Sequence, residues 1–169
     1  DGIVDLYYRA AQEAGFDASK VRVACETVAT TNRLAVLGEV RGPDGISTEQ
    51  IEETVRGAIR DIGYEQDKFH WKNLTFDNWL HEQSADIAQG VDEGTGTFTE
   101  EGAGDQGIMF GYASNETPEL MPAPLVFSHQ ILREMATLRH SGARPEFEPD
   151  SKSQVTVKYV DGKPVGVDT

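Results

Sequence analysis

Several features that would narrow the protein's class are scarce in this sequence. Cys25 is the single cysteine, so a disulfide within the chain is excluded, which fits a reducing compartment such as the cytoplasm. No apolar run approaches the roughly 20 residues that a membrane-spanning helix needs. Lys and Arg number 15 against 29 Asp and Glu, which gives a formal net charge of -14. Such a field repels nucleic acid and anionic membranes, so we expect neither as a partner.

Spacings typical of a zinc site are also missing. The four histidines do not stand at ligand spacing from one another or from Cys25, so we expect no zinc. Cys25 lacks the neighbours that would mark a nucleophile, and its position in an apolar stretch favours burial. Hydrophobic residues make up 38% and charged residues 26% of the 169 residues, as in an ordinary globular protein of one domain or two small ones.

Apolar periodicity in the first half predicts a helix, a hairpin and a second helix. Ser47 or Thr48 is expected to cap the second helix, with Gln50 three residues after Ser47 as in a capping box, and Gly63 is expected to end it. The following residues, 64–88, are aromatic-rich and aperiodic, and suggest only a covering segment or a short strand. The elements expected before them are a helix over 1–14, strands over 21–28 and 33–40, and a helix from about 47 to 63.

The second half begins with a stretch rich in glycine and acidic residues, 89–107, which predicts a long loop. Beyond it we expect a strand over 107–113, a helix over 125–141, a strand over 154–159, a hairpin turn at Asp161–Gly162 and a returning strand over 165–167. Helices and strands recur in both halves of the chain, which indicates an α+β fold of repeated αβ units, with mixed or antiparallel sheets and helices on one face.

Several strings occur in an order that is specific to one protein family. The most distinctive is GAGDQGIMFGYA at 102–113. The others are VRVACET at 21–27, Gly38-Glu39, QGVD at 89–92, Asn115-Glu116-Thr117, LMPAP at 120–124 and PDSKSQVT at 149–156. With these motifs the sequence resembles the S-adenosylmethionine synthetase (methionine adenosyltransferase) family over nearly its whole length.

The resemblance implies a transferase that forms S-adenosylmethionine from ATP and L-methionine and then hydrolyses the triphosphate to phosphate and pyrophosphate. It also implies two Mg²⁺ ions per site, a K⁺ ion, a cytoplasmic location, and a homodimer or homotetramer with active sites at the subunit interface. Because the net charge repels ATP, binding requires Mg²⁺ and a local cluster of Lys and Arg.

Particular residues take roles by the same resemblance. Asp105 is expected to be catalytic and to lie near the methionine amine and the sulfonium. The other expected roles are methionine binding by Glu39 and Gln89, ATP binding by Asp150, Ser151 and Lys152, and potassium binding by Glu26. The implied domains are residues 1–88, a mobile active-site loop over 89–104, and an incomplete central domain over 105–169.

Without the motifs, each of these residues has a simpler interpretation. Asp105 would be a turn former, Glu26 and Glu39 would be carboxylates on a solvent-facing side of a strand, and 150–152 a solvated surface loop. The family's His-Pro-Asp-Lys motif and its later glycine-rich phosphate loop do not occur in these residues. We therefore expect this stretch alone to be inactive. An inactive fragment or pseudo-enzyme subunit with the same fold remains an alternative, as does an unrelated acidic αβ binding domain.

Overall fold

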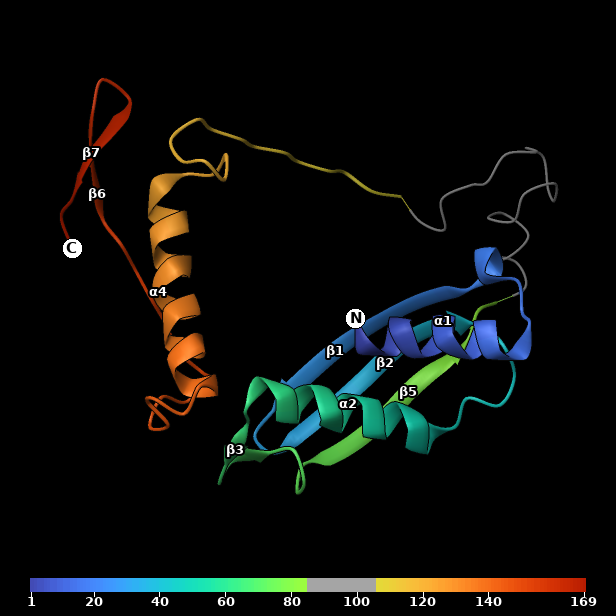
Figure 1. Ribbon diagram of the computed structural model, residues 1–169. Coiled ribbons are helices and arrows are strands. Elements are labelled where there is room, and N and C mark those ends of the chain that lie inside the picture. Colours follow the sequence, from blue (N-terminus) through green and yellow to red (C-terminus); the bar gives the residue numbers. More distant parts are fainter. Residues whose placement is uncertain (85–105) are drawn as a thin grey trace. The chain divides into compact units, whose positions relative to one another are not determined.

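The computed structural model describes residues 1–84 and 106–169, which form two compact units, Asp1–Gly107 and Ile108–Thr169 (Figure 1). The first unit contains α1 (Gly2–Ala14), a 3-10 turn (Ala18–Lys20), β1 (Arg22–Thr30), β2 (Arg33–Arg41), α2 (Thr48–Ile62), β3 (Glu65–Gln66), β4 (Phe69–His70) and β5 (Thr75–Glu82). The second contains α4 (Ala123–His140), β6 (Val157–Val160) and β7 (Lys163–Val167). This mixed α+β architecture confirms the predicted fold class.

Local signals fix both ends of α2. The Gln50 amide donates to Ser47 Oγ at 3.3 Å, and the Ser47 amide donates to Gln50 Oε1 at 2.8 Å, so the predicted capping box is present. Gly63 ends the helix in the left-handed conformation with φ 103°. The helix predicted over 1–14 is confirmed as α1, and Gly15 ends it in the same way.

The sheet of the first unit is mixed, in the order β1-β2-β5. β1 and β2 form the predicted antiparallel hairpin, with Asn32 at φ 49° in its turn. β5 pairs in parallel with β2, after the crossover through α2. This third strand lies in residues 64–88, for which the sequence suggested either a covering segment or a short strand.

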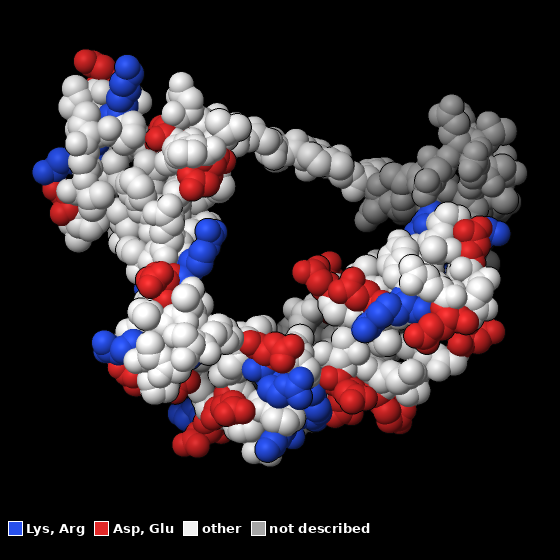
Figure 2. Space-filling model, in the orientation of Figure 1, with Lys and Arg blue, Asp and Glu red and all other residues white. Residues whose placement is uncertain are grey.

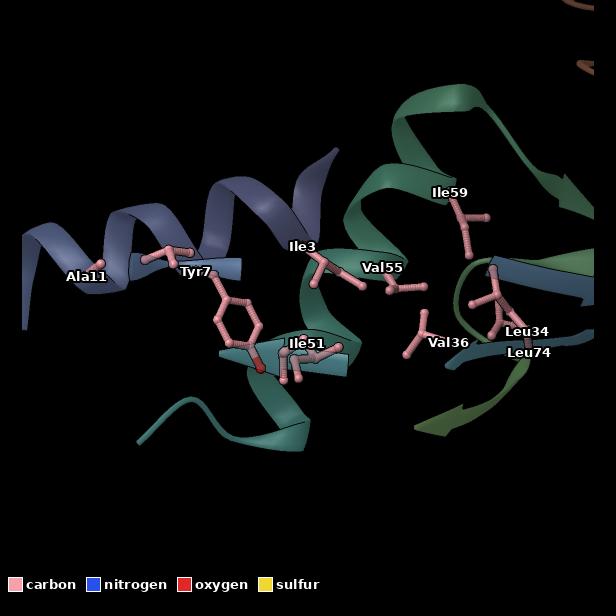
Figure 3. Packing of buried hydrophobic residues seen from close by; sticks show 11 residues of the cluster. Ile3, Tyr7, Ala11, Leu34, Val36, Ile51, Val55, Ile59 and Leu74 are labelled. Atoms are coloured by element: carbon pink, nitrogen blue, oxygen red, sulfur yellow. The ribbon is translucent and has the colours of Figure 1, made fainter. Parts of the chain in front are cut away.

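The core lies between this sheet and the two helices, which cover the same face of it (Figures 1 and 3). Alternate residues of β2 point toward the helices, where burying apolar side chains stabilises the layer by roughly 1.5–3 kcal/mol for each large side chain. The buried members of the cluster are Ile3, Tyr7, Ala11, Val21, Leu34, Val36, Val40, Ile51, Val55, Ile59 and Leu74.

The second unit pairs α4 with a short hairpin. α4 begins after Pro122, and Gly142 follows its last turn with φ 75°, close to the predicted limits. β6 and β7 pair antiparallel around Asp161 and Gly162, both at positive φ, as the turn signal predicted. β6 begins at Val157, later than the predicted strand start at 154. None of the helices in residues 1–84 and 106–169 has the length and apolar character of a membrane span.

The prediction of a strand over 107–113 is wrong for the structure as described. Residues 107–113 form no strand, and Ile108, Met109, Phe110 and Tyr112 are 79–95% exposed. An apolar sequence becomes a strand only when a neighbouring strand accepts and donates its backbone hydrogen bonds. No such neighbour pairs with this segment among the described residues.

Candidate functional site

Glu26 and Glu39 lie on the face of the first sheet that points away from the helices. Their chain neighbours Cys25 and Val40 belong to the core side, and side chains alternate along a strand. In the β1–β2 register Glu26 is opposite Leu37, and Glu39 is opposite Ala24. The two residues are therefore diagonal neighbours, and residues in such positions are about 7–8 Å apart on neighbouring strands.

Gly38 fixes the backbone beside Glu39. Its φ is 135°, and a Cβ at this position would lie 2.0 Å from the Ala24 carbonyl oxygen of the neighbouring strand. Only a residue without a Cβ allows this close approach of β1 and β2. The Gly-Glu pair in the sequence thus has a structural reason, because the glycine sets the register that places Glu39 opposite Ala24.

On its other side Glu39 neighbours His81 of β5, its partner in the parallel register. His81 is exposed, and its Nδ1 lies 3.1 Å from the carbonyl oxygen of Glu82. Sequence reasoning gave His81 no role. No local pattern in residues 75–82 marks this position, because it follows only from the parallel pairing of β5 with β2.

The rest of this outer sheet face is partly apolar. Val28 is 56% exposed and Trp79 is 62% exposed, while Leu37 between them is half-buried. Leu37 pairs in register with both Glu26 and Trp79, so this apolar group borders the carboxylates directly. The face therefore offers acidic groups beside an apolar surface, a combination suited to a ligand with a cationic end and an aliphatic part.

Asp150, Ser151 and Lys152 lie together on the connection between α4 and β6. Lys152 Nζ is 3.7 Å from Asp150 Oδ1, and these side chains are 90% and 67% exposed. Ser151 Oγ donates to the Glu148 carbonyl oxygen at 3.1 Å. An exposed ion pair of this kind contributes little to stability, so both charges are available to a ligand.

The remaining predicted site residues, Gln89 and Asp105, lie outside the described residues. The structure thus brings Glu26 and Glu39 together on one sheet face, and Asp150–Lys152 together on one connection in the other unit. A hollow of about 530 Å³ lies between Tyr7, the loop 42–46 and the end of β5, and none of the described candidates lines it.

The described part of the chain offers few groups to bind either a metal ion or a triphosphate. Residues 1–84 and 106–169 contain no group of three or more His, Cys, Asp or Glu arranged to hold a metal ion. The visible face in Figure 2 shows the described Lys and Arg scattered among Asp and Glu, with no broad basic surface. These residues do not fit a complete Mg²⁺ site, whereas Glu26 offers one hard oxygen donor of the kind that K⁺ accepts.

Comparison with known proteins gives matches along both units. Residues 1–85 match the family model described as S-adenosylmethionine synthetase, N-terminal domain, and residues 100–169 match the central domain of the same family. The S-adenosylmethionine synthase of Bradyrhizobium diazoefficiens is 61% identical over 168 residues, which is 99% of this chain and 42% of that protein.

Other relatives give the same result. The S-adenosylmethionine synthase of Parvibaculum lavamentivorans is 59% identical over 167 residues, which is 99% of this chain and 41% of that protein. S-adenosylmethionine synthase 2 of Rhodopseudomonas palustris strain BisB18 is 60% identical over 168 residues, again 99% of this chain and 42% of the relative. The chain therefore spans about 42% of the length of the relatives that it matches.

Proposed function

The chain belongs to the S-adenosylmethionine synthetase family, and we propose that the protein containing it forms S-adenosylmethionine from ATP and L-methionine. The triphosphate product is then hydrolysed to phosphate and pyrophosphate. The structural observation that carries this proposal is the placement of Glu39 and Glu26 on one open sheet face, in a register that Gly38 fixes.

The first step joins the methionine sulfur to C5′ of ATP and breaks the bond between C5′ and the triphosphate oxygen. A thioether sulfur carries no proton that must be removed, so this step needs no general base. Catalysis then depends on holding sulfur and C5′ in line and on stabilising the charges that develop. Carboxylates serve the sulfonium and the methionine amine, both of which are cationic.

Glu39 suits the methionine side of this site. It is half-buried, it lies beside the apolar group of Leu37 and Trp79, and it keeps its carboxylate on the open face. An ammonium group can pair with the carboxylate while an aliphatic chain contacts the apolar neighbours. Gln89 and Asp105 complete this set in our proposal, with Asp105 as the catalytic carboxylate near the sulfonium.

Asp150, Ser151 and Lys152 serve the nucleotide side. The Asp150 carboxylate can accept hydrogen bonds from the ribose hydroxyls, and Lys152 supplies a positive charge. The formal net charge of -14 makes this cation valuable, because most of the chain repels a triphosphate. Mg²⁺, when bound, would neutralise the phosphates. The described residues do not form its site, so further ligands and cations come from other parts of the assembly.

Glu26 is assigned to potassium. Its carboxylate is exposed on β1, diagonal to Glu39, and would supply one hard oxygen ligand. A cation there would also offset the repulsion between two neighbouring carboxylates. Glu26 therefore acts on the methionine site through its neighbour rather than on the reacting atoms.

We also propose the wider organisation that the family implies. Residues 1–88 and 105–169 form two domains, and 89–104 form a loop over the active site, although 85–105 lie outside the described residues. The open apolar group of Val28, Leu37 and Trp79 supports a homodimer or homotetramer in which a second copy covers this face. A cytoplasmic location is consistent with the unpaired Cys25.

The competing proposal is a catalytically inactive subunit that keeps the fold. Its supporting observation is that residues 1–84 and 106–169 hold no group of three or more His, Cys, Asp or Glu placed to bind a metal ion for the triphosphate. Mass spectrometry of the intact protein separates the two proposals, since a mass near 18.5 kDa favours the inactive fragment. A mass more than twice this value favours the enzyme.

Replacement of Glu39 tests the role assigned to the sheet face. In the protein that contains this chain, Glu39→Gln should raise the KM for methionine by about tenfold, because the lost ion pair is a charge-assisted contact of about 1.5–3 kcal/mol. The KM for ATP should change by less than about twofold. Glu53→Gln, at an exposed position of α2, is the matched control and should leave both constants unchanged. Equal effects of the two substitutions would refute the assignment.

A further inference from the structure

Glu116 joins three parts of the second unit. One carboxylate oxygen, Oε2, accepts a hydrogen bond from the Ala123 amide at 3.0 Å and another from the Tyr159 hydroxyl at 2.5 Å. Ala123 is the first residue of α4, and Tyr159 lies in β6. Glu116 itself belongs to the segment 114–120, whose ends are joined by the bond from the Ser114 amide to the Leu120 carbonyl at 3.0 Å.

Both contacts favour an ionised Glu116. An anion at a helix N-terminus interacts favourably with the helix dipole, and a hydroxyl that donates to a carboxylate forms a short, charge-assisted bond. The amide of Ala123 and the hydroxyl of Tyr159 accordingly lower the pKa of Glu116. The same contact with Glu116 raises the pKa of Tyr159 to about 12, so the hydroxyl keeps its proton at physiological pH.

The nucleotide residues lie on the connection between α4 and β6, residues 141–156. At the C-terminal end of α4 the connection is held by the Arg144 amide, which donates to Leu138, and by Arg139 Nη1, which donates to the Glu148 carbonyl at 3.5 Å. Arg139 and Ala123 are about 24 Å apart along α4, at 1.5 Å per residue. The bond between Glu116 and Tyr159 therefore fixes the connection at the opposite end of the helix.

Within the connection itself the nucleotide residues have few restraints. Lys152 and Asp150 contact each other at the surface, and Ser151 Oγ donates to a carbonyl three residues earlier. Their position relative to α4 thus depends on how β6 is held. On β6, Lys158 pairs with Asp168 of the same hairpin at 2.7 Å, whereas Tyr159 donates a hydrogen bond to Glu116 outside the hairpin.

We propose that Glu116 and Tyr159 form a positioning pair for nucleotide binding, which holds β6 against the start of α4 and thereby places Asp150 and Lys152 for ATP. This inference rests on the proposed function, since it takes the segment 150–152 as the ATP contact. Neither member of the pair touches the nucleotide in this account. Their loss should weaken ATP binding through misplacement of the connection.

The test uses the protein that contains this chain, with Tyr159→Phe, Glu116→Gln and the double variant. Each single substitution should raise the KM for ATP and the Kd for Mg-ATP measured by calorimetry by about three- to tenfold, a part of what one charge-assisted bond contributes. The KM for methionine should stay within about twofold, and the double variant should be no worse than the single ones because the two residues act as a unit. Tyr8→Phe is the matched control, since this tyrosine on α1 is 41% exposed and should leave all constants unchanged.

The outcomes separate this inference from the proposed function. If the unsubstituted protein forms S-adenosylmethionine and the variants keep its ATP affinity, the positioning role is wrong and the proposed function stands. Variants that lose affinity for both substrates equally would show a general loss of stability and would also overturn it. If the unsubstituted protein does not bind Mg-ATP, both proposals fail.

Discussion

Replacement of Gly38 by alanine tests how the sheet positions Glu39. The new Cβ would lie 2.0 Å from the Ala24 carbonyl oxygen and 3.5 Å from the Cys25 Cα, and the backbone would remain at φ 135°. These atoms and the Ala24 carbonyl carbon at 3.0 Å all belong to the backbone, so a side-chain rotation cannot relieve the contact. β1 must move away from β2, or the backbone at 38 must change conformation.

The cost can be estimated from two contributions. A non-glycine residue in a sparsely populated backbone region costs about 1–3 kcal/mol. Forcing an extra carbon into a packed position costs about 1–3 kcal/mol more. Gly38→Ala should therefore lower the free energy of unfolding of the first unit by about 2–6 kcal/mol.

Gly57 provides the matched control for this substitution. It lies within α2, and a Cβ added there meets no atom within 4 Å. Alanine is favoured over glycine inside a helix by about 0.8–1 kcal/mol, so Gly57→Ala should be neutral or stabilising. The two changes add the same methyl group and differ in the backbone around it.

Hydrogen exchange by mass spectrometry, together with thermal unfolding, measures the effect locally. Gly38→Ala should increase exchange in peptides from β1 and β2 and lower the unfolding temperature, whereas Gly57→Ala should do neither. The KM for methionine should rise with the first change because Glu39 is displaced. Protection of β1 and β2 equal to that of the unsubstituted protein would refute the claim that Gly38 sets this register.

Two other predictions concern the second unit. Glu116→Gln should lower the pKa of Tyr159 from about 12 toward its usual 10. Ultraviolet difference absorbance measures this pKa, with Tyr159→Phe as the blank. An unchanged pKa would contradict the contact between Glu116 and Tyr159. Because the folded-state pKa is raised, this contact stabilises fully below pH 10, and its contribution is lost as pH rises through about 12. Lys152→Met should raise the KM for ATP by about tenfold, because a positive charge near the nucleotide is lost. The control Lys163→Met, on the β6–β7 hairpin, should change the KM for ATP by less than about twofold. Equal effects of the two substitutions would show that Lys152 does not bind ATP.

Elements with strong local signals were predictable from the sequence. α2 carries its capping box and its terminal glycine within its own sequence, and the turn at Asp161 and Gly162 needs only the conformations that these two residues favour. β5 could not be assigned in this way, because its pairing with β2 is parallel and depends on the crossover through α2. For the segment 107–113 the sequence predicts a strand that the structure does not contain. Its apolar composition favours a strand, but no described strand pairs with it.

The site divides along similar lines. That Glu26 and Glu39 share a sheet face follows from the alternation of side chains once the hairpin is assigned. Glu39 and His81 are neighbours only because of the β2–β5 register. The hydrogen bond between Glu116 and Tyr159 joins residues 43 positions apart in the sequence. Neither contact has a local sequence pattern, because each arises only when distant segments pack.

In our proposal a carboxylate site in this chain supports S-adenosylmethionine formation by the protein to which it belongs. Single-turnover product analysis with ATP, methionine, Mg²⁺ and K⁺ tests this role, for the unsubstituted protein and for Asp105→Asn. The unsubstituted protein should form equal amounts of S-adenosylmethionine, phosphate and pyrophosphate. Asp105→Asn should lower the rate of S-adenosylmethionine formation by about 100-fold, with little change in ATP binding, as expected when one preorganised electrostatic contact is lost. No S-adenosylmethionine from the unsubstituted protein, or the same rate for Asp105→Asn, would contradict the account.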